Sequence, residues 1–229
     1  MLKFAKKDST SEMLEELITE EAHRRSIPSV NSTFDPIHIT ECSRRMVYRS
    51  RGIKHKSSLG YLQRASEDAC RKKWLDIFKN SLKIRLIDQG IVVADSKYNI
   101  TGKVDALISF GNNDKFAIKI KSVSESDFGN IKETGALRKD VVESILYLWL
   151  LEIKNGLLIY DNNNGGFVVF HVEPYAPIIK SVKQKCDDMI RQNMEGHLPE
   201  RSYKESSSVE CEVCEFNKSC WNIEGDYDR

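Results

Sequence analysis

Apolar residues follow two different spacings along this chain, and each spacing predicts a type of secondary structure. Residues 11–25 and 59–79 place apolar side chains at helical intervals, with charged residues between them. From residue 83 to 121 the apolar residues instead gather in short β-branched stretches. Turn-like residues at 96–99 and 111–114 separate these stretches. The first half of the chain therefore predicts helices followed by a strand meander.

The second half returns to helical spacing. Residues 137–153 predict a strongly apolar helix, and residues 176–194 a closing helix. Between them, residues 156–160 and 166–172 predict two strands joined by an Asn- and Gly-rich turn. This order of elements predicts an α/β fold, with a mixed central sheet flanked by helices.

A short basic helix is expected near the start of the chain, with Thr40 as its N-cap and Gly52 at its end. It contains Arg44, Arg45, Arg49 and Arg51, and Lys54 follows it. The whole chain has 35 Lys and Arg against 34 Asp and Glu, so any nucleic-acid contact must come from a local cluster such as this one. The alternative is a solvated helix face.

Length and composition narrow the class of protein. The 229 residues suffice for one buried α/β domain with a small appendage. No apolar run approaches the length of a membrane span, and the first residues do not resemble a signal peptide. We therefore expect a cytoplasmic protein without a membrane partner.

Three cysteines crowd the C-terminus with the spacing Cys-x2-Cys-x5-Cys, at Cys211, Cys214 and Cys220. Thiols at this spacing predict a metal-binding loop, which needs a fourth ligand. Cys42 is the best candidate because it stands in a polar, basic segment. Four thiolates suit a [4Fe–4S] cluster or zinc, and spacing alone leaves both open. Cys70 and Cys186 fall inside helical patterns and are expected in the core.

A second group of chemically active residues lies in the strand region. Lys119 and Lys121 alternate on one strand and share a face, while Asp105 on the preceding strand lies beside them if the register allows. Glu67, on the helix before the sheet, is a second candidate carboxylate. Carboxylates near a lysine are what Mg2+- or Mn2+-assisted phosphodiester hydrolysis requires, although a solvated face gives the same pattern.

Taken together, these motifs resemble the PD-(D/E)XK nuclease superfamily, and especially its RecB-like branch with an iron–sulfur cluster. That branch includes CRISPR-adaptation exonucleases and many phage-encoded relatives. The matching features are Cys42 followed by two arginines, the G-x-x-D strand ending at Asp105, the strand ending in I-K-S at residues 120–122, and the terminal cysteine trio followed by a tryptophan. Glu143 and Tyr147 occupy the place of the branch's Q-x-x-x-Y motif.

The resemblance implies a restriction-endonuclease-like core at 58–198. An N-terminal helical segment at 1–57 and a C-terminal cysteine loop at 199–229 would together hold a [4Fe–4S] cluster. It also implies an exonuclease acting on DNA, with a preference for single-stranded ends and with protein partners in a recombination or CRISPR-adaptation-type complex. Arg44, Arg45, Arg49, Arg51, Lys54 and Tyr147 are its implied nucleic-acid contacts.

The chain departs from the family pattern where a metal-binding carboxylate is expected, because Lys119 stands there. In one hypothesis Glu143 replaces the missing carboxylate, so that Glu67, Asp105 and Glu143 bind the ion while Lys119 or Lys121 serves the nucleophile. In the other, the Lys119 ammonium excludes the ion, and the fold survives as a DNA-binding or assembly subunit.

Overall fold

The computed structural model describes residues 9–25, 33–52, 59–111 and 114–222, without the side chains of residues 9–11, 22–25 and 59–63. Lys54, an expected DNA contact, lies outside these residues. None of the described helices is long and apolar enough to cross a membrane.

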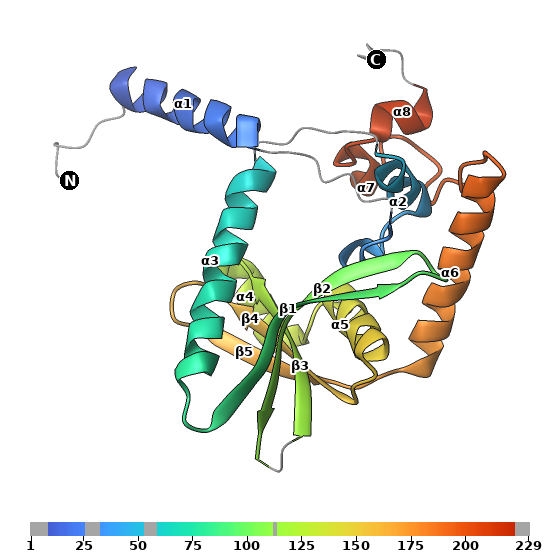
Figure 1. Cartoon of the computed structure of the whole chain (residues 1–229). Helices are drawn as coiled ribbons and strands as arrows, with labels where there is room; N and C mark the ends of the chain where they lie inside the picture. The colour runs from blue at the N-terminus through green and yellow to red at the C-terminus, as the bar shows by residue number, and fades with distance from the viewer. Residues whose placement is uncertain (1–8, 26–32, 53–58, 112–113, 223–229) are drawn as a thin grey trace.

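A five-stranded mixed sheet forms the centre of the protein, as predicted (Figure 1). Its strands follow chain order: β1 (Ile84–Asp95), β2 (Ile100–Phe110), β3 (Asp114–Ser122), β4 (Asn155–Asp161) and β5 (Phe167–Val172). All neighbours are antiparallel except β3 and β4, which run parallel. A parallel pair needs a long crossover connection, and the helices between β3 and β4 provide it.

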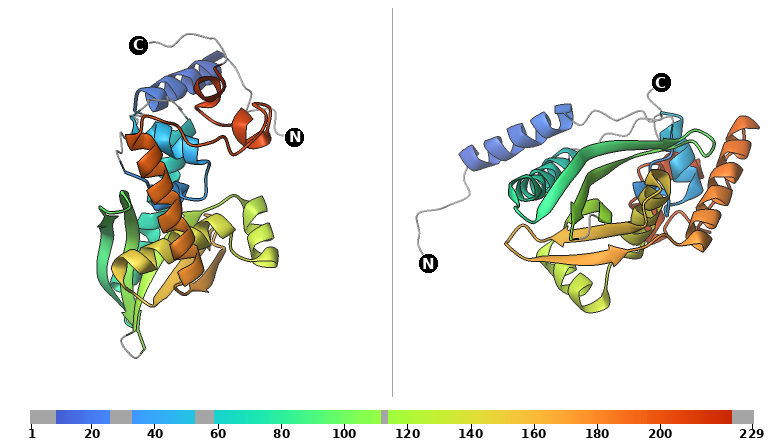
Figure 2. Two further views of the ribbon diagram at one scale, coloured as in Figure 1. Left: turned by 90° about the vertical axis from the view of Figure 1, so that its right-hand side faces the viewer. Right: turned by 60° about the horizontal axis from the view of Figure 1, so that its bottom comes forward.

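Helices cover both faces of the sheet (Figure 2). On one face, α3 (Leu59–Asn80) buries Trp74 and Phe78 against β2, β3 and β4. On the other face, α4 (Glu125–Thr134) and α5 (Arg138–Leu151) pack over the strands, and α6 (Ala176–Met194) lies beside α5. The sheet is therefore buried on both sides at its centre, where a polar group needs a partner.

Segments from both ends of the chain meet beyond the end of the sheet. They comprise η1 (Pro36–His38), α2 (Ser43–Ser50), α7 (Val209–Glu212) and α8 (Asn217–Trp221), with α2 beside α7 and α8 (Figure 1). Phe34 joins this part to the sheet through a bridge to Ile100. In contrast, α1 (Ser9–Arg25) projects away from the body near the start of α3.

The predicted elements differ from the observed ones in three places. Cys42, not Thr40, is the N-cap of α2, although Gly52 with a φ of 72° does follow its end. The two apolar stretches between residues 84 and 95 form one strand, which contains an irregularity between Leu86 and Asp88 and a Gly90 with a φ of 63°. The sequence did not predict helix α4, because Phe128 and Ile131 are its only apolar residues and two positions do not establish a helical spacing. Both are buried in the structure.

Candidate functional site

Asp105 lies at a fork in the sheet. The β2–β3 pairing runs from Phe110–Asp114 to Ala106–Ile118 and stops there, after which β2 remains with β1 and β3 with β4. Asp105 is the next residue on β2, and its Oδ2 accepts a hydrogen bond from the Ile120 amide at 2.8 Å. The side chain thus satisfies a backbone group that the fork would otherwise leave unpaired. Asp105 is 2% exposed.

The two lysines of β3 face α5. Their neighbours Ile118 and Ile120 pack with α3 on the opposite face of the sheet, as strand alternation requires. The Lys119 Nζ lies 3.6 Å from Asp105 Oδ2 and 3.3 Å from Glu143 Oε1, with 11% of the side chain exposed. The ammonium group therefore sits between the two carboxylates.

Lys121 completes the link between β3 and α5. Its Nζ lies 2.6 Å from Glu143 Oε2 and 3.2 Å from Asp140 Oδ1. Burial raises the pKa of Glu143, but Lys119 and Lys121 outweigh burial and hold that pKa below its ordinary value. Burial likewise lowers the pKa of Lys121, but Glu143 and Asp140 outweigh it and raise that pKa. Both groups are charged at neutral pH.

Helix α3 adds a third cation. Arg71 Nε donates to Asp105 Oδ1 at 2.6 Å, and the same guanidinium contacts Asp68 on its own helix. With Ile120 on Oδ2, both oxygens of Asp105 are occupied. The central cluster thus contains three carboxylates and three cations: Asp105, Asp140, Glu143, Arg71, Lys119 and Lys121.

The structure brings together four of the five predicted catalytic residues, Asp105, Lys119, Lys121 and Glu143. Glu67 lies one turn before Arg71 on α3. Asp140 was missed, although its place three residues before Glu143 puts both on one side of α5. Among the described residues, no three His, Cys, Asp or Glu side chains are placed to hold one metal ion.

Tyr147 forms a wall beside Lys119. The Lys119 Nζ lies 5.4 Å from the centre of its ring, and the ring is 3% exposed. A Cβ added at Gly102 would lie 2.8 Å from this ring and from Pro36, so a glycine is required there. Tyr147, which the family resemblance implied as a nucleic-acid contact, is therefore a buried residue in this structure.

A second candidate site lies where the chain ends meet. A cavity of about 230 Å³ is lined by all four predicted metal ligands, Cys42, Cys211, Cys214 and Cys220. Cys70 and Cys186 are buried elsewhere, as expected for core residues. The cavity wall also includes Tyr48 and Phe216, whose rings stack with centres 5.2 Å apart.

The surroundings of Cys42 favour its thiolate. Burial raises the pKa of this thiol, but hydrogen bonds from Ser202 and from the backbone at the start of α2 outweigh burial and lower it. Arg44 Nη1 also lies 3.6 Å from Cys220 Sγ. These donors would stabilise anionic sulfur, which is the form that ligates metals.

The arginines of α2 hold the C-terminal segment. Arg45 and Arg49 both pair with Glu215 and Glu41, with nitrogen–oxygen distances of 2.5 to 3.4 Å. Arg44 donates to the carbonyls of Pro199 and Cys220, and Arg51 to Asn193 and His197. The prediction that these four arginines contact DNA therefore competes with an observed role in holding the chain together.

Solved structures with a similar fold include one of the protein SSO0001 and two of one exonuclease. The crystal structure of SSO0001 matches with a TM-score of 0.56 at 19% identity, over 93% of this chain and 98% of that one. An alkaline exonuclease from Laribacter hongkongensis, LHK-Exo, matches with a TM-score of 0.56 at 9% identity, over 77% of this chain and 93% of its own. Its complex with dAMP gives 0.57 at 10% identity, with the same coverage.

No protein-family model and no curated protein matches the chain. At these identities the likeness is one of fold. The chain therefore has the fold of an alkaline exonuclease, which agrees with the predicted nuclease-like core.

Proposed function

We propose that this protein binds DNA on an exonuclease fold and does not hydrolyse it, because its own lysine takes the position of the divalent cation. One observation carries this proposal: the Lys119 ammonium lies within 3.6 Å of both Asp105 and Glu143. These are the two carboxylates that a cation in the site would need.

Charge balance argues against a divalent ion at this point. The three buried carboxylates of the central cluster already contact three cations, Arg71, Lys119 and Lys121, of which Arg71 also contacts the exposed Asp68. An ion with two positive charges a few ångströms from the ammonium would be repelled by several kcal/mol, even at an effective dielectric constant of about 20. The residues present therefore do not fit a Mg2+ or Mn2+ ion while Lys119 keeps its charge and position.

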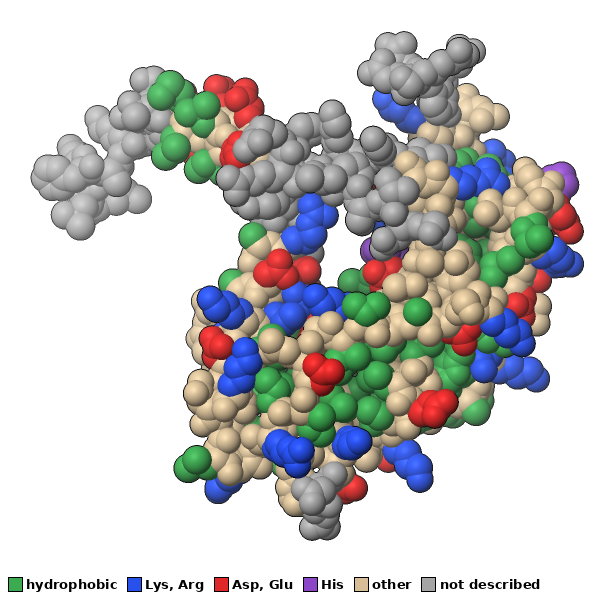
Figure 3. All heavy atoms as spheres, viewed as in Figure 1, with side chains coloured by type: hydrophobic (Ala, Val, Ile, Leu, Met, Phe, Trp, Pro, Cys, Tyr) green, Lys and Arg blue, Asp and Glu red, His purple; other side chains and the backbone are tan. Residues whose placement is uncertain are grey.

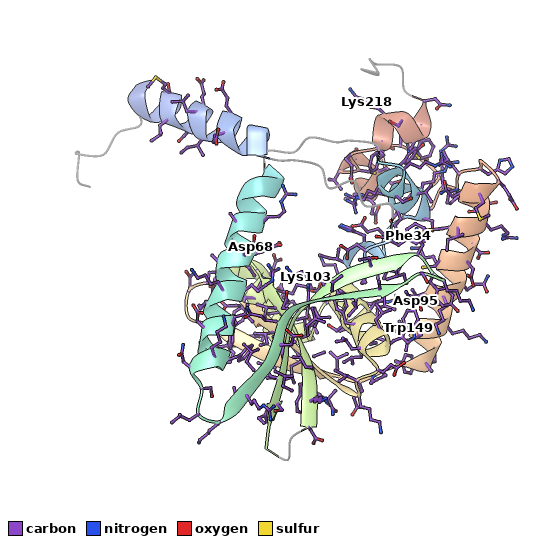
Figure 4. All side chains as sticks on the ribbon, viewed as in Figure 1. Phe34, Asp68, Asp95, Lys103, Trp149 and Lys218 are labelled. Carbon is purple, nitrogen blue, oxygen red and sulfur yellow. The ribbon has the colours of Figure 1, made fainter. Side chains whose placement is uncertain are left out.

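DNA as the ligand is supported by the fold likeness and by exposed cations on α3 and β2, the elements that carry Arg71 and Asp105. Arg64 and Lys72 on α3 are exposed, as is Lys103 on β2, whose carbonyl accepts from Lys119 at 3.4 Å. Figure 4 places Lys103 across from Asp68 of α3. Cations at such positions contact phosphates without reading sequence.

A second candidate is an active nuclease in which Glu143 has replaced the missing carboxylate. It is favoured by the same geometry, since Asp105 and Glu143 converge on one point once Lys119 moves away. The two candidates differ in one outcome, which is metal-dependent cleavage by the unmodified chain.

The test measures Mg2+- or Mn2+-dependent degradation of single-stranded and duplex DNA, together with DNA binding by fluorescence anisotropy. We expect binding without cleavage for the natural chain, and cleavage after Lys119→Glu. Lys115→Glu is the matched control, because it makes the same charge change at an exposed position of the same strand. Cleavage by the natural chain that disappears in Glu143→Gln would instead establish the active nuclease. Absence of DNA binding would remove both.

The same proposal includes a [4Fe–4S] cluster held by Cys42, Cys211, Cys214 and Cys220. Its support is that these four cysteines, one at the start of α2 and three in the C-terminal segment, line one cavity of about 230 Å³. Such a cluster would join the two chain ends. Absorbance near 400 nm in anaerobically purified protein is the expected result, and colourless protein with stoichiometric zinc would contradict it.

A further inference from the structure

Helix α1 carries an apolar stripe that no other described segment covers. Met13, Leu14, Leu17 and Ile18 are 57%, 55%, 52% and 48% exposed. At helical spacing these four fall on one side of α1, where Glu21 follows them one turn later, and Glu12, Glu16 and Glu20 fall on the other side or along its edge. Figure 3 shows apolar and acidic side chains together on this projecting helix. An amphipathic helix of this type fits a groove with apolar walls and a basic rim.

A groove of that chemistry lies elsewhere on the same chain. A cavity of about 470 Å³ opens between η1, the start of α5 and α6. Its apolar wall includes the partly exposed Ile178 and the buried Ile39, Val142 and Val182, and its basic side includes Arg138 and Lys139. Ile178 and Val182 are four residues apart and so lie on one face of α6.

The basic rim has no acidic partner within the described part of the chain. Arg138 and Lys139 are exposed, and no ion pair or hydrogen bond involves either side chain among the described residues. They also stand in the first turn of α5, where the helix dipole disfavours cations. An acidic group placed there would therefore gain attraction from both side chains and from the helix end.

We propose that α1 of one copy of this protein docks in the groove between α5 and α6 of a second copy. The apolar stripe of α1 packs on Ile178, with the buried Val142 and Val182 beneath it, and the flanking glutamates meet Arg138 and Lys139. Each copy presents both halves of the contact, with α1 beside α3 and the groove on the α5–α6 side (Figure 1). If two copies each place α1 in the groove of the other, the result is a dimer. If each copy instead binds the next one, the result is a closed ring. This assembly does not depend on the proposed DNA binding.

Sedimentation velocity of the full chain over a range of concentrations tests the proposal. We expect a concentration-dependent species larger than the monomer. Replacing Leu14 and Leu17 together by glutamate should weaken assembly by about 100-fold or more, since two apolar side chains lose their burial. A chain that stays monomeric at all concentrations would overturn the proposal.

Charge reversal identifies the groove as the partner. Arg138→Glu with Lys139→Glu should weaken assembly, as should Glu16→Lys with Glu20→Lys, and a mixture of the two variants should assemble again. The control is Lys180→Glu with Lys204→Glu, which reverses two exposed cations outside the groove. Circular dichroism verifies that each variant is folded. If only the α1 variants lower the mass, α1 pairs with α1 and the proposal is wrong. If the groove variants weaken DNA binding and leave the mass unchanged, the groove is a nucleic-acid contact, and the proposal is equally wrong.

Discussion

The central cluster and the cysteine cavity differ in whether their potential metal ligands already have partners. Around Asp105 and Glu143 the chain supplies a cation for every carboxylate, and the groups touch one another. Around Cys42 the four candidate thiol ligands border an open volume. A site that neutralises itself has little to gain from an ion, whereas ligands arranged around a space can gain much from filling it.

Removal of one cavity thiol is the strongest way to test this contrast. If a cluster joins the chain ends, Cys42→Ser should abolish the absorbance near 400 nm and lower the Tm by about 10 °C, which corresponds to a loss of several kcal/mol. The measurements are iron content and thermal unfolding. Cys70→Ala is the control, because Cys70 lies on α3 and is buried against the sheet, away from the cavity. Iron retained in Cys42→Ser would exclude this thiol as a ligand.

Neutralising one member of the central cluster should have the next largest effect. Glu143 is 1% exposed and contacts both lysines, so Glu143→Gln should lower the free energy of unfolding by about 3 to 5 kcal/mol. Urea titration measures this change. Glu133→Gln, at an exposed position of α4, should change it little. In Lys119→Met/Glu143→Gln, charge balance returns and much of the lost stability should be recovered.

Acid should weaken the central cluster in a defined direction. The pKa of Glu143 is lower in the folded chain than its ordinary value of 4.5, so its contribution to stability is complete above that value. The contribution is lost as the pH falls from about 4.5 through the lower folded pKa. Urea midpoints measured across this range should fall less steeply for Glu143→Gln than for the natural chain. Equal slopes would contradict the assignment of a charged Glu143.

The smallest expected effect concerns the ion pairs that hold the C-terminal segment. Glu215 accepts from Arg45 and Arg49 and its side chain is 12% exposed. Glu215→Gln should therefore cost about 2 kcal/mol and make the C-terminal segment easier to cleave by protease. Glu210→Gln, an exposed neighbour on α7, should leave proteolysis unchanged. Identical digestion of the two variants would show that these pairs contribute little.

The sequence predicted most of the fold because the spacing of its apolar residues is regular over long segments. Helix α6 was predicted at its observed bounds, and the strand alternation correctly put Lys119 and Lys121 on one face. In contrast, the part played by Arg71 depends on how α3 lies on the sheet, which no local pattern contains.

The arginines of α2 also show that local sequence does not reveal contacts between distant segments. Its sequence shows several arginines close together, but the two glutamates that pair with them include Glu215, more than 160 residues away. A charge cluster in sequence therefore does not reveal whether its charges face solvent or a distant segment of the same chain.

The most direct test of the central claim is a crystal structure of the natural chain soaked in Mn2+, with anomalous scattering used to locate the metal. We predict no manganese between Asp105 and Glu143, with the Lys119 ammonium at that point. A manganese ion bound by both carboxylates, with Lys119 turned away, would contradict the account and make the protein a metal-dependent enzyme candidate again.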